Sequence, residues 1–360
     1  MLTRLKIPRA GVLLLTAILA AGSASRGLAA ERTSFNVAWS IYVGWMPWDY
    51  ADRSGILKKW ADKYGIKIKL TQINEYVESI NQYTAGTFDA CAMTNMDMLT
   101  IPAAGGVDST ALIVGDYSDG NDGVVLKGKG KTLVDIKGQK VNLVELSVSH
   151  YLLARALASA GMRERDLKII NTSDADIVAA FSAPATTAIV TWKPQLSAVL
   201  SAPNAQLVFD SSKIPGEILD LMVVKTDLLN ANPKLGKALI GAWYETLGVM
   251  FKNDAAGQAA RTAMAKASGT DLEGFGRQLA TTHIFATPAD AYAFVTGDRL
   301  VKSMDLVRKF SFEHGILGQG ATSVDAVGIL FPTGAPLGDS RNVKMRFDAG
   351  FTKQALDGKL

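Results

Sequence analysis

Apolar and polar residues alternate along the chain in a way that predicts strands and helices in regular succession. Residues 66–70, with the sequence Ile-Lys-Ile-Lys-Leu, show the period of two that is typical of a half-buried strand. A helix that ends at Gly65 precedes this strand, and its apolar face is formed by Ile56, Leu57, Trp60 and Tyr64. Further elements are predicted as strands at 35–41 and 88–93 and a helix at 77–85. This order predicts a parallel sheet with helices on its faces.

The middle of the chain repeats this scheme, and the last third is mostly helical. Strands are predicted at 139–144, 167–170 and 187–190, and helices at 151–160 and 176–181. Later helices are predicted at 243–251, 255–267 and 289–310. From residue 315 onward, Gly and Pro interrupt the pattern, which predicts extended segments and a short last helix near Gln354.

Two stretches of the chain resemble each other, because residues 88–95 and 187–192 each place a strand after a helix and a turn of small residues. This predicts an α/β fold with two lobes and a cleft between them. Lobe 1 is expected to comprise residues 31–116 and 221–360, including the C-terminal helices, and lobe 2 residues 117–220. About 330 residues suit two lobes of ordinary domain size.

The first thirty residues have the layout of a secretory signal peptide. Arg4, Lys6 and Arg9 precede an apolar run at 11–21, and small residues follow up to Glu31. We expect cleavage after residue 29 or 30. The apolar run is too short to span a bilayer, which needs about 20 residues, and no Cys follows the cleavage region to carry a lipid. A soluble periplasmic protein is therefore expected.

Removal of this leader makes the chain neutral. The leader holds four basic residues and no acidic one, so totals of 38 basic and 34 acidic residues become 34 of each. Nucleic acid and phospholipid surfaces are not expected partners, because both attract clustered Lys and Arg. The chain has a single Cys, Cys91, which can form no internal disulfide and is expected to be a buried structural thiol.

Polar and aromatic side chains gather in the segments that follow the predicted strands. In parallel sheets, ligands bind beyond the carboxyl ends of strands, where loops lead into helices. This rule selects residues 45–50, 74–76, 94–97, 116–121, 145–150, 172–176 and 192–194. The residues expected to bind a ligand are Trp45, Trp48, Asp49, Glu75, Asn95, Asp97, Asp116, Glu145, Ser147 and Trp192.

These candidates combine carboxylates with aromatic faces and contain no Arg. Guanidinium stacks on aromatic rings and donates paired hydrogen bonds to carboxylates, so the pattern favours a nitrogen-rich cation, or neutral urea, over an anion. Structural roles stay open for several of them. Asp49, Asn95, Asp97 and Ser147 could cap helices, and Trp45, Trp48 and Trp192 could face the core. Glu217 and Asp220 are more distant acidic candidates.

The motifs of common enzymes are missing or incomplete. Residues 123–129 match G-x-x-x-x-G-K, but Gly130 stands where Ser or Thr would hold a metal ion. His150, His283 and His314 are scattered and form no H-E-x-x-H pattern, and there is no G-x-S-x-G elbow. The sequence therefore predicts a binding protein without cofactor, metal or catalytic activity.

The chain resembles the nitrate/taurine-type (NitT/TauT) binding proteins of ABC importers across residues 35–225. The similar segments, in the family's order and spacing, are 55–59 with 65–68, 85–90, 135–141, 174–177 and 191–194. Residues 182–187 depart from the family's usual turn. The resemblance implies a type II periplasmic-binding-protein fold, in which two lobes close on a solute, and delivery to an ABC permease driven by an ATPase.

More narrowly, the Trp-rich segment at 45–50 and the sequence Thr94-Asn-Met-Asp97 are similar to the binding component encoded with urea carboxylases. That likeness implies urea or guanidine as the solute. Other interpretations are a receptor for a thiamine-precursor pyrimidine or another aromatic amine, a receptor for nitrate or a sulfonate, a sensor subunit, and an exported enzyme. A related thiamine-pyrimidine synthase has a Cys-rich iron site, which a single Cys disfavours. A monomer is expected.

Overall fold

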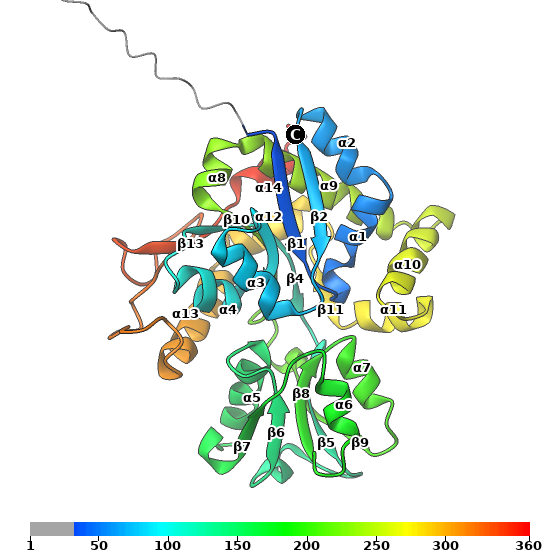
Figure 1. Cartoon of the computed structure of the whole chain (residues 1–360), viewed down its shortest axis with the longest axis vertical. Coiled ribbons are helices and arrows are strands. Elements are labelled where there is room, and N and C mark those ends of the chain that lie inside the picture. The colour runs from blue at the N-terminus through cyan, green and yellow to red at the C-terminus, as the bar shows by residue number, and fades with distance from the viewer. Residues whose placement is uncertain (1–31) are drawn as a thin grey trace, which may run out of the picture. The chain divides into compact units, whose positions relative to one another are not determined.

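A computed structural model describes residues 32–360, so the predicted signal peptide lies outside the described residues. The strands form two sheets, which we call the large sheet and the small sheet (Figure 1). The large sheet has the order β12-β13-β4-β10-β3-β1-β2, with β11 paired to β4, and the small sheet has the order β7-β6-β8-β5-β9. Both sheets carry helices, as the alternating pattern predicts.

One edge of the large sheet is formed by the strands that the sequence pattern predicts near the start of the chain. β1 (Ser34–Trp39) lies parallel to both β2 (Lys67–Gln72) and β3 (Ala90–Thr94). All five residues of β3 are buried, Cys91 among them, and Cys91 is a free thiol as expected. Burial raises the pKa of the Cys91 thiol to about 12, so the thiol stays protonated at neutral pH.

Two long strands of the large sheet were missed by the sequence analysis. β4 (Ser109–Ser118) and β10 (Leu219–Lys225) pair antiparallel, and β10 also pairs antiparallel with β3. Both are almost fully buried, so their side chains do not alternate between apolar and polar. The remaining strands of this sheet are β11 (Thr282–Ile284), β12 (Gly328–Leu330) and β13 (Val343–Phe347).

The small sheet comprises β5 (Asp122–Lys127), β6 (Lys140–Leu143), β7 (Lys168–Asn171), β8 (Ala188–Trp192) and β9 (Ala205–Asp210). β6 is parallel to β7 and β8, whereas β5 is antiparallel to β8 and β9. Residues 123–127 of the G-x-x-x-x-G-K match lie inside β5, which excludes a phosphate-binding loop there. The helices that accompany the small sheet are α5 (Val148–Ser159), α6 (Ile177–Ser182) and α7 (Gln195–Leu200).

The helices of the first and last parts of the chain accompany the large sheet. Those of the first part are α1 (Met46–Arg53), α2 (Ile56–Lys63), α3 (Tyr76–Ala85) and α4 (Asn95–Met98). Those of the last part are α8 (Thr226–Ala231), α9 (Pro233–Met250), α10 (Ala255–Ala267), α11 (Leu272–Leu279), α12 (Pro288–Val295), α13 (Asp298–Glu313) and α14 (Gly350–Leu356). Within residues 32–360, no helix has both the length and the apolar content required to cross a bilayer.

Three predicted elements differ from the structure. The helix expected at 243–251 is α9, which begins ten residues earlier at Pro233. The aromatic segment 45–50, expected as a loop, begins α1, because Pro47 suits a helix start and Trp48 buries its ring against Trp243 of α9, with ring centroids 5.0 Å apart. The helix expected at 289–310 is divided into α12 and α13 at Gly297, which lacks a side chain and has an extended backbone.

The chain passes between the two sheets at two points, and serines tie these crossings together. The first crossing joins β4 to β5 and the second joins β9 to β10. The hydroxyls of Ser118 and Ser211 lie 2.6 Å apart, and the Gly120 N–H donates to the Ser211 hydroxyl at 2.8 Å. Strands up to Ser118 and from Leu219 belong to the large sheet, and strands between them to the small sheet. The lobe boundaries near residues 116 and 220 remain a prediction.

Removing the Ser211 hydroxyl should destabilise the protein. S211A leaves the half-buried Gly120 N–H without its acceptor and the buried Ser118 hydroxyl short of one partner, so we expect a loss of about 1–3 kcal/mol in the free energy of unfolding. Chemical denaturation would measure it. S201A, which removes an exposed serine hydroxyl, is the control and should change stability by less than about 0.5 kcal/mol. Equal stabilities of the two variants would contradict the structural role of Ser211.

Candidate functional site

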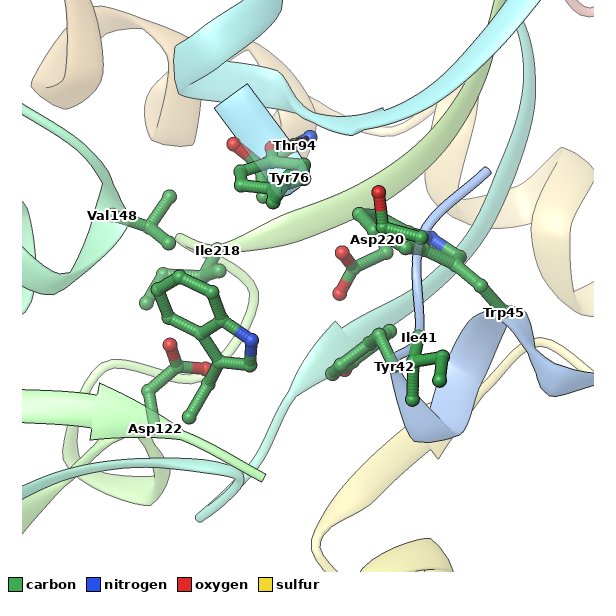
Figure 2. Close-up of a pocket in the computed structure, with 11 residues that line it drawn as sticks. Ile41, Tyr42, Trp45, Tyr76, Thr94, Asp122, Val148, Ile218 and Asp220 are labelled. Carbon is green, nitrogen blue, oxygen red and sulfur yellow. Dashed lines mark hydrogen bonds between the residues drawn. The ribbon is translucent and has the colours of Figure 1, made fainter. Parts of the chain in front are cut away.

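A pocket of about 380 Å³ opens where the two sheets meet (Figure 2). Residues from the large sheet and its helices line one part of it, and residues from the small sheet and α5 line the other. The lining residues are Ser40, Ile41, Tyr42, Trp45, Tyr76, Thr94, Asp122, Val148, Trp192, Ile218 and Asp220. Many of them follow the carboxyl ends of β1, β3 and β8, which is where open α/β sheets bind ligands.

Four aromatic rings form a continuous series through this pocket. Tyr42 and Trp45 meet edge to face with centroids 5.1 Å apart, and Trp45 lies 5.6 Å from Tyr76. Tyr76 in turn contacts Trp192 of β8 at 5.9 Å, edge to face. The series therefore links the large sheet to the small sheet. Rings arranged in this way give a flat solute several faces on which to stack.

Two buried aspartates form an acidic pair at the pocket. Asp116 of β4 and Asp220 of β10 are direct cross-strand partners, and their side chains are hydrogen-bonded to each other. The Tyr42 hydroxyl donates to Asp116 at 3.1 Å. Burial raises the pKa of Asp116 to about 7, although bonds from Asp220 and Tyr42 oppose the rise. Burial and the charge of Asp116 raise the pKa of Asp220 well above its ordinary value.

A third carboxyl group, Asp122, faces the pocket from the first residue of β5. It accepts a hydrogen bond from the Ser118 hydroxyl at 2.5 Å. Burial raises the pKa of Asp122 to about 6, while Ser118 and the charge of Lys193 oppose the rise. Lys193 directs its ammonium group to the Thr281 hydroxyl, 2.6 Å away. Among residues 32–360, no Lys, Arg or His forms an ion pair with Asp116, Asp122 or Asp220.

Gly44 allows the acidic pair to sit against the backbone. A Cβ atom at this position would lie 2.3 Å from Asp116 Oδ2 and 2.6 Å from Tyr42 Cε1. Both distances are far below van der Waals contact. Any side chain at residue 44 would therefore have to push Asp116 or Tyr42 out of place.

Comparison with known proteins identifies the family of the chain. The model of the NMT1-like family matches residues 39–265, which is more than half of the chain. The chain belongs to the NMT1-like family. A protein of Brucella abortus named as a binding protein is 26% identical over 145 residues, which are 39% of this chain and 44% of that protein. The chain thus matches less than half the length of this curated relative.

An Escherichia coli protein named as an aliphatic sulfonates-binding protein is 36% identical over 84 residues, 23% of this chain and 26% of its own length. Solved structures resemble this NMT1-like protein over more of the chain. The alkanesulfonate-binding protein of Xanthomonas axonopodis, bound to MOPS, has a TM-score of 0.65 at 17% identity, covering 80% of this chain and 96% of its own.

The nitrate-binding protein of Synechocystis has a TM-score of 0.56 at 13% identity and covers 92% of this chain and 99% of its own. The predicted fold is thereby confirmed as the two-lobed α/β fold of periplasmic binding proteins.

The sequence-predicted residues divide into groups. Trp45 and Trp192 line the pocket, whereas Asp116 does not line it but pairs with Asp220 and accepts a hydrogen bond from Tyr42, which both do. Asp97 does not line it but holds two residues that do, because it accepts hydrogen bonds from the Tyr76 hydroxyl at 2.6 Å and the Thr94 hydroxyl at 2.7 Å. Burial raises the pKa of Asp97 to about 6, although these two bonds oppose the rise.

A second cavity is lined by three of the residues that the sequence predicts to bind a ligand. Glu145, Ser147 and Asp97 line this cavity of about 480 Å³, together with residues of α3 and the start of α5. Ser147 caps α5, since its hydroxyl accepts from the Ser149 N–H at 3.2 Å. Glu75 lies at the start of α3, where its carboxyl group is hydrogen-bonded to Asp174 beyond β7. Burial and the charge of Glu75 raise the pKa of Asp174 to about 6.

Three predicted ligand residues lie away from the pocket. Trp48 packs against Trp243 of α9, whereas Trp45, which precedes α1, lines the pocket. Asp49 accepts a hydrogen bond from Arg53 at 2.8 Å within the same helix and does not cap it. Asn95 fixes the second crossing, accepting from the Leu219 N–H and donating to the Glu217 carbonyl, each at 3.0 Å.

Sequence analysis missed Asp122 as a lining residue and ranked Asp220 too low. Asp122 lies one residue beyond the segment 116–121 that the strand-end rule selected, so a slightly longer window would have included it. Asp220 lies on β10, and no signal in the sequence pairs that strand with β4. Tyr42 and Tyr76 were available as aromatic residues near strand ends, but spacing alone did not rank them.

A histidine cluster outside the pocket is the candidate metal centre among the described residues. His150 Nε2 and His314 Nε2 lie 3.2 and 2.7 Å from Glu164 Oε1. The Leu146 N–H donates to His150 Nδ1 at 3.1 Å, so the proton of neutral His150 sits on Nε2, the atom that would have to bind a metal. These residues fit an ion-paired cluster better than a metal site.

In this cluster, His314 meets an acceptor with each ring nitrogen. Nδ1 lies 2.8 Å from the Phe310 carbonyl oxygen and Nε2 2.7 Å from the Glu164 carboxylate, which indicates a doubly protonated imidazolium. The bond to Glu164 raises the pKa of His314. Partial burial raises the pKa of Glu164, but bonds from His150 and His314 outweigh it and lower this pKa to about 2.

The E164Q variant should lower the pKa of His314 towards its ordinary value of about 6.5. The raised pKa of His314 stabilises the wild type fully below about pH 6.5, and this stabilisation is lost as the pH rises through the folded-state pKa of His314. The lowered pKa of Glu164 stabilises the wild type above about pH 4.3, and this stabilisation is lost as the pH falls through about 2. The stability difference should be largest between about pH 4.5 and 6.5. NMR titration of the histidines and denaturation at several pH values would measure both effects. E313Q, a neighbour with a smaller effect on His314, is the control. An unchanged His314 pKa in E164Q would disprove the ion pair.

The G44A variant should disturb the acidic pair. The added methyl group overlaps Asp116 and Tyr42, and such overpacking costs about 1–3 kcal/mol. G248A is a matched control in α9, because a Cβ there meets nothing within 4 Å, and replacing a helical Gly by Ala stabilises by up to about 1 kcal/mol. Chemical denaturation should give shifts of opposite sign. A G44A protein as stable as the wild type would show that residue 44 does not constrain Asp116.

Proposed function

We propose that this protein is the solute-binding component of an ABC importer and captures a small nitrogen-rich solute, guanidine or urea, in the pocket between its sheets. The periplasmic-binding-protein fold supports the general role. The carrying observation for the solute is the series of four rings beside three buried carboxyl groups that have no ion-pair partner among the described residues.

The chemistry of the pocket matches a planar donor of several N–H groups. Guanidinium stacks on Trp or Tyr faces and donates paired hydrogen bonds to a carboxylate. Trp45 and Trp192 offer such faces, and Asp220 directs its carboxyl group into the space that the lining residues enclose (Figure 2). Urea offers the same donors without the charge.

The importer role implies particular partners. The exported, monomeric protein closes its two halves on the solute and delivers it to a membrane permease powered by an ATPase, without chemical change of the solute. The paired crossings at Ser118 and Ser211 are where such closure would bend the chain. The serine contacts are short and buried, which confines the bending to a small region.

An anion such as nitrate or a sulfonate is the second candidate. Thr94, Tyr76 and Val148 lie at the starts of α4, α3 and α5, so three helix N-termini face the pocket, and helix N-termini attract anions. The Trp45 indole N–H is buried without an acceptor in residues 32–360, and an oxygen of a solute would satisfy it. A flat aromatic amine would stack on the same rings.

A solute screen tests the proposal. Guanidinium at micromolar to low millimolar levels, urea, nitrate, taurine and an aminopyrimidine would be compared by thermal shift and calorimetry. A bound solute at 100 times its Kd should add about 2.7 kcal/mol of stability. W192A should weaken guanidinium binding roughly tenfold, through loss of about 1–2 kcal/mol of stacking energy. W60F changes a tryptophan of α2 outside the pocket and should bind like the wild type.

The outcomes separate the candidates. If nitrate or taurine stabilises the protein and guanidinium and urea do not, the carboxyl groups do not select the solute, and the receptor role alone stands. If none of these solutes binds, the proposed solute classes are wrong. If W192A and the wild type bind guanidinium with equal affinity, the solute does not bind in this pocket.

A further inference from the structure

We propose that the Asp116–Asp220 pair binds the solute as a monocation in exchange for one proton, so that binding expels the proton which the two carboxyl groups share. The inference rests on the proposed function and goes further by assigning the charge of the solute, the residues that read this charge and the coupling of binding to pH.

Geometry requires the shared proton. The two residues are direct partners in the antiparallel pairing of β4 with β10, which places both side chains on one face of the sheet. Asp116 has 0% and Asp220 4% of its surface exposed. Two buried carboxylates at facing positions of paired strands repel each other strongly without water between them, whereas one carboxylate and one carboxylic acid attract. The pair therefore retains one proton at neutral pH.

The surroundings of the pair supply no competing cation. Tyr42 donates to Asp116 from the segment after β1, and the third facing group, Asp122 of β5, is also acidic. Lys193 of the small sheet acts on Asp122 and is itself bonded to Thr281. The local charge is thus negative, and desolvation, together with repulsion between the aspartates, retains the proton. A cation beside the carboxyl groups would offset both the desolvation and the repulsion, which are the two reasons why the pair retains its proton.

The exchange balances in atoms and charge. In the free protein one member of the pair is a carboxylate and the other a carboxylic acid, with a net charge of minus one. The solute cation approaches, the O–H bond of the acid breaks, and the proton leaves to water or buffer. Asp220, which lines the pocket, then accepts N–H donors of the cation, and the negative charge of Asp116 lies beside it. The bond between the carboxyl groups is replaced by charge-assisted bonds to the solute.

This coupling would discriminate between solutes of nearly the same shape. Urea and guanidinium are both planar, but neutral urea cannot compensate a second carboxylate, so the proton stays when urea binds. Affinity for the cation should rise about tenfold per pH unit below the upper pKa of the pair and level off above it. Affinity for a neutral solute should change little over the same range.

Calorimetry of the wild-type protein tests the exchange without any variant. Guanidinium binding would be measured in two buffers of different ionisation enthalpy, between about pH 5 and pH 9. We expect release of close to one proton per bound guanidinium near neutral pH, and a smaller fraction as the pH rises through the upper pKa of the pair. Infrared difference spectra should show loss of a carboxylic-acid C=O band when guanidinium binds. Binding with no proton release at any pH would overturn the exchange and leave the proposed function standing.

Variants assign the proton to the pair. D220N should abolish proton release and weaken guanidinium binding roughly 10- to 100-fold, since one charge-assisted contact is lost. D348N removes a half-buried aspartate whose pKa is also raised by burial, far along the chain near α14, and should keep wild-type release. Asp174, bonded to Glu75, is a second carboxyl pair. If D174N abolishes release and D220N retains it, the proton comes from that pair and the proposal is wrong.

Discussion

The antiparallel pairing of β4 with β10 is the constraint on which the site depends. β10 returns the chain from the small sheet and enters the large sheet between β3 and β4. Because the two strands run in opposite directions, the end of β4 lies beside the start of β10, so the chain leaves and re-enters the large sheet at one place. The same pairing sets Asp116 opposite Asp220. One register thus fixes both the crossings and the acidic pair, and a slip by one residue would turn one of the carboxyl groups to the other face.

The cost of burying these carboxyl groups explains the features around them. An isolated charge is expensive in a region without water, and groups there accept a proton before they remain charged and unpaired. Tyr42 and Ser118 each donate a hydrogen bond to one of the aspartates, and Asp116 and Asp220 bond to each other. Asp97 shows a different solution, since two hydroxyl donors hold it and through it fix the positions of Tyr76 and Thr94. The first arrangement leaves carboxyl groups available to a solute, whereas the carboxyl group of Asp97 positions residues that line the pocket.

Much of the fold follows from sequence pattern because the peripheral elements carry clear periodicity. α10 coincides with its predicted range of 255–267, and β1, β2 and α3 differ from theirs by one or two residues at either end. Among the missed strands, β4, β5 and β10 are almost fully buried, so no polar residue marks their period. The candidate site was predicted less completely for the same reason. Trp45 and Trp192 follow strands that the pattern reveals, whereas Asp220 lies on a strand that it hides. Trp48 was misplaced because segment 45–50 was expected as a loop but begins α1, and helical geometry then sets the direction of its side chain.

Gly44 links the backbone of one segment to the chemistry of another. A Cβ atom at residue 44 would lie 2.3 Å from Asp116 Oδ2, so the two positions cannot vary independently. In related chains, a larger residue at 44 should occur only together with a smaller or neutral residue at 116. Such paired changes would mark lineages that have exchanged the acidic pocket for another kind of site. Changes in solute preference among these proteins should therefore be accompanied by changes at Gly44, although this residue does not contact the solute.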